Sequence, residues 1–183
     1  ASKFFILNHY NANVAPLPIL EEKRAKSSQI FPQMDYIEKT ILNVRTMSMQ
    51  DKDETYRGID REEPDELCYG ALLTLFGVFK TEYNHINLLT KSSQKGFNTA
   101  NFWLGYCYEK GLGVEQSNLK AENYYLEIIN SNYAESLWGN IFEGSDEGRI
   151  LLESYYRLAL IKYRSENYNS QEIKHILRIG HPN

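Results

Sequence analysis

The chain has 183 residues, of which 42% are hydrophobic and 24% charged, and this composition is typical of one folded domain or a short repeat array. Its longest aliphatic and aromatic run, residues 4–7, is far shorter than the roughly 20 residues of a bilayer-spanning helix, so we expect no membrane span. The formal net charge of −4 provides no basic field for phosphate backbones, so we also expect no nucleic acid partner.

Residues 1–63 are predicted to form a divergent N-terminal segment that contains a loop, one or two helices and a charged linker. Pro16 and Pro18 favour extended or looped structure at the start, because proline fixes its own backbone and restricts the residue before it. Apolar residues follow Pro32 at spacings of three and four. This spacing predicts a helix over residues 33–49.

Residues 51–66 are almost entirely charged or polar and include Gly58 and Pro64. We predict a solvated linker here, with Pro64 in the first turn of the next helix. The acidic side chains of this stretch lack the alternating Asp/Asn/Gly spacing of a calcium loop, so we assign them to helix capping and solubility.

From residue 64 onward the sequence predicts helices and no strand, because no segment alternates with period two for long enough. One helix starts at Pro64 and ends at the Gly77 break, and the next continues from about His85 to a stop at Gly96. Further helices are expected over residues 99–110, 119–130, 135–143, 149–164 and 170–178. The expected fold class is therefore all-α.

An internal repeat is visible in the second half of the chain. The pattern Ala-x3-Leu-Gly-x2-Tyr at residues 100–108 recurs as Ala-x3-Trp-Gly-x2-Phe at residues 134–142, an offset of 34 residues. The small residues in this pattern allow two helices to approach closely, while the larger ones fill the space between them. A fixed offset of this size indicates a helical repeat architecture.

Residues 100–136 resemble a Sel1-like repeat, a relative of the tetratricopeptide repeat. The matching positions are Ala100, Leu104, Gly105, Tyr108, Gly111, Gly113, Val114, Lys120, Ala121, Tyr124, Tyr125 and Ala134. This resemblance implies a short α-solenoid of antiparallel helix pairs over residues 64–183, in which each pair is stabilised by its neighbours.

Gly111 and Gly113 are separated by one residue, a spacing that also occurs in phosphate-binding loops. Here the glycines follow a helix rather than a strand, and no third glycine stands at the required distance. We therefore interpret them as a turn between antiparallel helices.

No constellation of catalytic or metal-ligating residues is recognisable. The four histidines are scattered, and Glu62, Glu63 and Asp65 share one exposed acidic stretch rather than the two different environments that acid–base catalysis needs. Cys68 and Cys107 allow either one disulfide or two buried free thiols, of which we favour the thiols. Cys107 lies among aromatic residues of the repeat and is expected to be structural. We expect no enzyme activity, no cofactor and no metal.

The sequence is rich in tyrosine, with 14 Tyr beside 8 Phe and 2 Trp, and Tyr and Trp often anchor protein interfaces. The resemblance implies that the first helix of each pair lines a concave binding surface. The candidate partner-binding residues are Trp103, Tyr106, Glu109, Leu137, Asn140 and Glu143. For Trp103 a place in the core is an open alternative.

The leading functional hypothesis is a non-catalytic protein–protein interaction module, such as a bacterial immunity or adaptor protein that binds and neutralises or positions one protein partner. Two alternatives stay open: a hydrolase acting on cell-wall material, with Glu62, Glu63 and Asp65 as its acids, or a fragment of a larger regulatory scaffold. No charged region precedes the short apolar run to form a signal peptide, but the chain begins with Ala, so we expect either a cytoplasmic or a periplasmic location.

Overall fold

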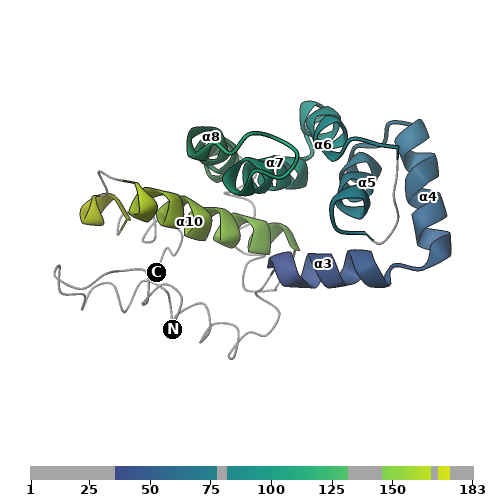
Figure 1. Ribbon diagram of the computed structural model, residues 1–183, viewed down its shortest axis with the longest axis horizontal. Helices are drawn as coiled ribbons and strands as arrows, with labels where there is room; N and C mark the ends of the chain where they lie inside the picture. The colour runs from purple at the N-terminus through teal and green to yellow at the C-terminus, as the bar shows by residue number, and fades with distance from the viewer. Residues whose placement is uncertain (1–35, 78–81, 132–145, 166–168, 174–183) are drawn as a thin grey trace. The chain divides into compact units, whose positions relative to one another are not determined.

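The computed structural model describes residues 36–77, 82–131, 146–165 and 169–173, which contain helices and no strand, so the all-α prediction is confirmed for them. The helices in chain order are α3 (Tyr36–Thr46), α4 (Met49–Asp60), α5 (Pro64–Phe76), α6 (His85–Gln94), α7 (Asn98–Lys110), α8 (Asn118–Asn130) and α10 (Asp146–Arg164) (Figure 1). Among the described residues, no helix is both long and apolar enough to cross a membrane.

The chain divides into two compact units. One unit comprises residues 36–128 and therefore holds α3 to α7 and most of α8. The other comprises residues 1–35 together with residues 129–183, and α10 is its long described helix.

The prediction of a charged linker over residues 51–66 is wrong for most of that stretch, because residues 49–60 form the helix α4. Ser48 caps its N-terminus: the hydroxyl accepts a hydrogen bond from the Asp51 backbone N–H at 3.1 Å and donates one to the Asp51 carboxylate at 2.6 Å. Lys52, Thr55 and Ile59 lie at helical spacing and are buried on the side that packs against α5. The charged side chains are mostly on the outer face of α4, where they are solvated.

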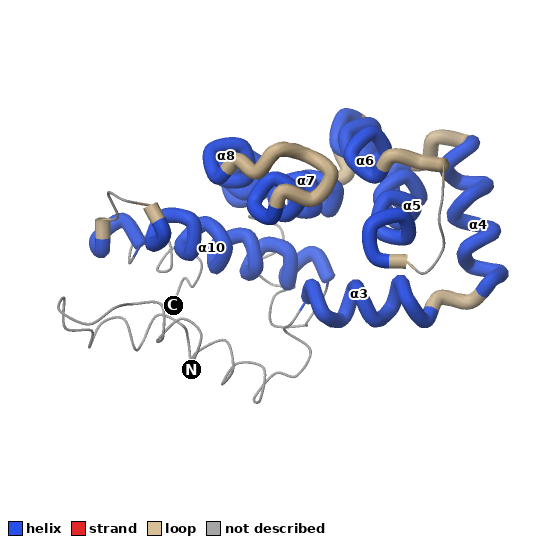
Figure 2. Tube along the Cα trace, in the orientation of Figure 1, coloured by secondary structure: helices blue, strands red, loops and turns tan. Residues whose placement is uncertain are grey.

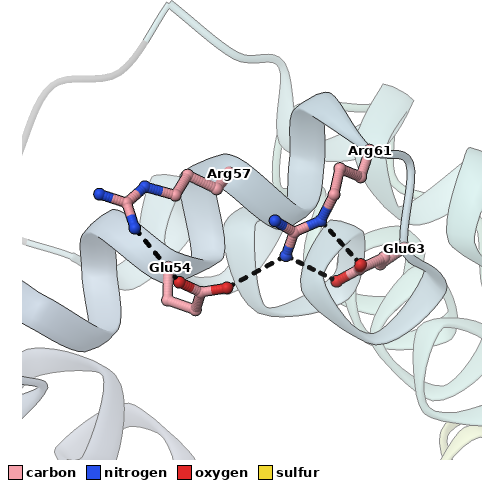
Figure 3. Close-up of polar contacts among 4 residues, drawn as sticks. All are labelled: Glu54, Arg57, Arg61 and Glu63. Atoms are coloured by element: carbon pink, nitrogen blue, oxygen red, sulfur yellow. Dashed lines mark hydrogen bonds and ion pairs between the residues drawn. The ribbon is translucent and has the colours of Figure 1, made fainter.

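A tight turn joins α4 to α5, and Glu62 adopts the left-handed conformation there with φ of 55°. The Arg61 guanidinium donates to Glu63 at 2.8 Å and to Glu54 at 3.0 Å, and Arg57 lies 3.6 Å from Glu54 (Figure 3). Between 43% and 70% of each of these side chains is exposed, so the network contributes little to stability and forms a charged surface on this hairpin.

Consecutive helices of the first unit pack against each other: α4 contacts α5, α5 contacts α6, and α6 contacts α7 (Figure 2). As predicted, Pro64 stands in the first turn of α5, where its missing N–H removes no hydrogen bond, and the helix ends at Gly77. The small residue Gly70 allows close approach of α4, since a Cβ there would lie 2.3 Å from Ile59 Cδ1. Helix α3 packs on α5 as well.

The predicted helix over residues 33–49 is shorter than expected in its described part, because α3 ends at Thr46 and a new helix starts at Met49. The N-cap at Ser48 explains this break, since a capping residue takes an extended rather than a helical backbone. The sequence pattern contains this signal, a serine followed three residues later by an aspartate.

Helix α10 was predicted over residues 149–164 and begins three residues earlier, at Asp146. Its side chains from residue 149 to 161 are all buried, including a Glu153–Arg157 ion pair with 3.3 Å between Oε1 and Nε. The predicted helix over residues 135–143 lies outside the described residues. Of the predicted helix over residues 170–178, the structure describes residues 170–173, and these are helical.

Candidate functional site: the aromatic face of helix α7

Helices α7 and α8 form the pair that the repeat pattern predicted, and each begins one residue earlier than expected. Gly111 ends α7 in the left-handed conformation with φ of 70°, and the N–H groups of Gly111 and Leu112 both donate to the Cys107 carbonyl. Gly113 follows with φ of 75°. The glycines thus act in a helix-to-helix turn, as predicted.

The contact between α7 and α8 centres on Gly105 and Tyr125. A Cβ at position 105 would lie 2.8 Å from Cε1 of the fully buried Tyr125 ring, so the absence of a side chain lets the ring lie against α7. The Tyr125 hydroxyl then donates a hydrogen bond to Glu109 Oε2 at 2.9 Å. This bond supplies a polar partner to a carboxylate that would otherwise be costly to bury.

Glu109, one of the predicted partner-binding residues, is therefore buried rather than on an accessible surface. Only 3% of Glu109 is exposed, and its second carboxylate oxygen lies 3.1 Å from Lys110 Nζ. In addition, the Gln116 side chain donates to the Glu109 backbone carbonyl at 2.9 Å, which attaches the turn to the end of α7. Glu109 is a structural residue of the α7–α8 pair.

Trp103, another of the predicted partner-binding residues, is also inaccessible, because its side chain is completely buried. Its indole Nε1 donates a hydrogen bond to the Tyr36 hydroxyl of α3 at 3.1 Å. Its ring is in edge contact with Phe76, Phe102 and Tyr106, with centroid distances of 5.4–5.5 Å. The alternative of a core position for Trp103 is the one the structure shows.

Tyr36 contacts Trp103 across the two helices, although it was not among the candidates predicted from the sequence. Its ring is 5.4 Å from Phe102 in an edge-to-face arrangement and 5.7 Å from Trp103, and only 4% of the residue is exposed. A signal was present, since Tyr36 and Ile37 precede Val44 at helical spacing, but no local pattern reveals that Tyr36 contacts α7. We call the cluster of Tyr36, Phe76, Phe102, Trp103 and Tyr106 the aromatic cluster.

Tyr106 is the candidate partner-binding residue that the structure leaves half-buried. It lies at the edge of the aromatic cluster, against Trp103. Its role in partner binding stays a prediction. Leu137, Asn140 and Glu143 lie outside the described residues.

A second aromatic group lies on the α7–α8 pair. The rings of Tyr108 and Tyr124 stack with centroids 5.8 Å apart and an angle of 13°, and Lys120 Nζ lies 4.9 Å from the centre of the Tyr108 ring. Partial burial, together with Tyr108 and Glu127 nearby, raises the pKa of Tyr124. Both tyrosines are half-buried and connect the two helices.

Exposed aromatic side chains outside this pair were not predicted. Tyr56 of α4 and Tyr83 stack with centroids 6.2 Å apart, and 37% of Tyr83 is exposed. Tyr69 of α5 is 41% exposed. Such aromatic residues add contact area to a surface without adding charge.

The two thiols are free and buried, as favoured from the sequence. Burial raises the pKa of Cys107 to about 12, and burial with Asp65 nearby raises that of Cys68 even further. Both are therefore protonated at neutral pH and lack the thiolate that a cysteine nucleophile requires. Within the described part of the chain, no three His, Cys, Asp or Glu side chains are grouped to hold a metal ion.

Two of the three acidic residues of the hydrolase alternative, Glu62 and Glu63, are held in surface ion pairs. Glu62 accepts a hydrogen bond from Lys91 at 3.0 Å and lies 3.4 Å from Lys95, and these two cations lower its pKa. Glu63 is paired with Arg61. A carboxylate with a lowered pKa stays ionised and does not serve as a general acid at neutral pH.

Comparison with models of protein families, with curated proteins and with solved structures finds no significant match to this chain.

Proposed function

We propose that this chain is a non-catalytic protein–protein interaction module built as a short α-solenoid of Sel1-like helix pairs. The observation that supports it best is the agreement between pattern and packing in α7 and α8. Gly105 admits the Tyr125 ring, and Gly111 and Gly113 form the turn, so these residues of the repeat pattern make the contacts that such a repeat requires. The successive packing of α4, α5, α6 and α7 is compatible with a stacked array.

The side chains available for binding favour a protein partner. Tyr106 and the exposed Tyr69 and Tyr83 combine a large apolar ring with a polar hydroxyl, the kind of residue that contributes strongly to protein interfaces. The buried thiols and the paired carboxylates described above are poorly suited to catalysis. A surface that binds without chemistry is thus the simpler function for this arrangement.

Within this class we propose an immunity or adaptor role, in which the protein binds and neutralises or positions one partner. The net charge of −4 and the exposed acidic residues of α4 favour a partner with a positively charged surface, because opposite charges accelerate association and suppress the wrong partners. Salt should therefore slow the association of the complex more than it accelerates dissociation.

An affinity capture from the source organism, read out by mass spectrometry, tests this function. The wild-type chain is compared with Tyr106→Ala, and Leu119→Ala serves as matched control because Leu119 is an exposed α8 residue outside the aromatic cluster. The captured protein is then purified and titrated by calorimetry. We expect one dominant partner whose affinity falls about tenfold or more in Tyr106→Ala, as for an interface anchor, and is unchanged in Leu119→Ala.

Two outcomes would contradict the proposal at different levels. If no protein binds at micromolar concentration, the interaction function is wrong. If one partner binds the wild type and Tyr106→Ala equally well, the function stands and the assignment of Tyr106 is wrong.

A further inference from the structure

The outer side of α4 carries two rows of side chains at helical spacing, and the first row is neutralised within the chain. Glu54, Arg57 and Arg61 stand three and four residues apart, and their charges are joined in the ion-pair network of Figure 3. The Glu54 carboxylate lies 3.6 Å from Arg57 and 3.0 Å from Arg61. This row therefore leaves little unbalanced charge for a partner to recognise.

The second row, Asp53, Tyr56 and Asp60, has the same spacing but a different character. Both aspartates are exposed, and neither side chain forms an ion pair or hydrogen bond with any described residue. They stand one turn before and one turn after Tyr56, about 10 Å apart along the helix axis. An aromatic ring is thus flanked on both sides by carboxylates that the described part of the chain leaves unneutralised.

Asp60 stands where a carboxylate does not help the fold. It is the last residue of α4, and the C-terminus of a helix carries a partial negative charge that disfavours an anion. No contact within the described ranges compensates this unfavourable position. A cationic group of a partner would compensate it, because it would neutralise the carboxylate and interact favourably with the helix end.

Tyr56 is one half of a tyrosine stack that the chain holds in place. The centre of its ring is 6.2 Å from that of Tyr83, at an angle of 20° between the rings, and 37% of Tyr83 is exposed. The residue after Tyr83 is fixed to α6, because the Asn84 side chain caps this helix and accepts from the Asn87 N–H at 3.1 Å. The stack is therefore a preformed part of the surface.

A second tyrosine stack of the same protein has a cation over it. Lys120 Nζ lies 4.9 Å from the centre of the Tyr108 ring, which stacks on Tyr124. Over the stack of Tyr56 and Tyr83 no described residue places a cation. Two similar ring pairs thus differ in one component, and the pair without a cation has two unneutralised carboxylates beside it.

We propose that Asp53, Tyr56, Asp60 and Tyr83 form a docking surface for an arginine-containing basic segment of a protein partner. A guanidinium stacks on an aromatic face and pairs with a carboxylate through its planar fork, whereas an ammonium is only a point charge. One arginine lies over the tyrosine stack and pairs with one aspartate, while a second cation binds the other aspartate. The inference rests on the proposed function for the existence of a partner, and it names the chemistry that this partner presents.

The first test uses a peptide probe on the full-length chain. The peptide has two arginines separated by two residues in a glycine and serine background, a spacing of about 10 Å in an extended chain. It is titrated into isotope-labelled protein and followed by NMR. We expect saturable shifts confined to the amides around residues 53–60 and 82–84. A peptide with citrulline in place of both arginines lacks the charge and should leave these amides unshifted. Equal binding of the two peptides would overturn the proposal.

The second test removes the carboxylates. Asp53→Asn/Asp60→Asn should weaken binding of the arginine peptide about threefold or more. Its melting temperature should be unchanged or higher, since Asp60→Asn removes the unfavourable charge at the helix end. Glu115→Gln/Glu127→Gln removes the same charge from exposed positions elsewhere and is the matched control. An equal loss of affinity in both double variants would mean that only net charge acts, which overturns the proposed surface.

The third test removes the aromatic face. Tyr83→Leu keeps an apolar side chain without the ring and should weaken peptide binding about twofold to fivefold, whereas Tyr83→Phe should bind like the wild type. Tyr83 is exposed and stands outside the described helices, so both variants should fold, and circular dichroism checks this. Undiminished binding by folded Tyr83→Leu would overturn the proposal, because the cation would then not use the tyrosine stack.

The affinity capture separates this surface from the proposed function. A captured partner that binds the wild type and Asp53→Asn/Asp60→Asn equally well would overturn the surface and leave the interaction function standing. Specific binding of the arginine peptide, with no partner captured at micromolar concentration, gives the reverse result. A wild-type dimer in sedimentation that Tyr83→Leu dissociates would assign the surface to a second copy of the chain and overturn the assignment to a basic partner.

Discussion

The imidazole of His85, at the start of α6, lies directly over Gly113 in the turn between α7 and α8. A Cβ at position 113 would be 2.5 Å from the ring atoms Cε1 and Nε2. The same Nε2 is 3.0 Å from the Leu112 carbonyl oxygen, within hydrogen-bond distance. This contact attaches α6 to the turn of the following helix pair, and it exists only because residue 113 has no side chain.

Gly113→Ala is expected to destabilise the protein more than Gly96→Ala. Both glycines have positive φ, so both substitutions carry backbone strain of about 1–2 kcal/mol. A Cβ at position 96 meets nothing within 4 Å, whereas one at position 113 collides with His85, which adds about 1–3 kcal/mol as overpacking does. Urea denaturation followed by circular dichroism measures the difference. Equal losses for the two variants would show that the His85 contact is unimportant.

Gly105→Ala tests the contact between α7 and α8. Alanine improves helix propensity by roughly 1 kcal/mol, but its Cβ would lie 2.8 Å from the buried Tyr125 ring and overpacking costs about 1–3 kcal/mol. We expect a net loss of stability, measured by urea denaturation. In a Tyr125→Leu background the ring is absent, so the same substitution should become neutral or stabilising. A loss of the same size in both backgrounds would place its cause elsewhere.

The sequence predicted the α7–α8 pair well because local features determine it. Apolar spacing places the helices, and two glycines with positive φ fix the turn. Helix α4 was not predicted, because its own local pattern is misleading. Its buried stripe contains Lys52 and Thr55, and polar residues on a buried stripe do not register as apolar periodicity.

The candidate site was predicted less well because burial on α7 depends on distant residues. Trp103 is buried against Tyr36, which stands 67 positions earlier, and buried Glu109 accepts a hydrogen bond from the Tyr125 hydroxyl, 16 positions later. The residue pattern of α7 contains neither Tyr36 nor Tyr125. Tyr106 is half-buried and is therefore the described candidate that stays partly accessible.

Tyr125→Phe should destabilise the protein although the ring is kept. The substitution removes the hydroxyl that donates to buried Glu109 Oε2, and the loss of a hydrogen bond to a buried charged group is expected to cost about 1–3 kcal/mol. Replacing Glu109 by Gln in the Tyr125→Phe background removes the buried charge and should recover part of this loss. Thermal unfolding of the four chains of this cycle gives the coupling between the two side chains. Additive effects would mean that the hydrogen bond contributes nothing.

Stability should fall as the pH rises above the range in which unfolded thiols titrate. Burial raises the pKa of Cys107 to about 12 and that of Cys68 as well, so the folded chain keeps both protons while the unfolded chain loses them above a pH of about 8.5. The stabilisation by the protonated thiols is therefore complete below that pH and declines above it, by at most about 1.4 kcal/mol per pH unit for each thiol. Urea denaturation at pH 7.5, 9 and 10 measures the slope. Cys107→Ala should make the slope shallower because one of the two thiols is gone, and an unchanged slope would exclude Cys107 as its source.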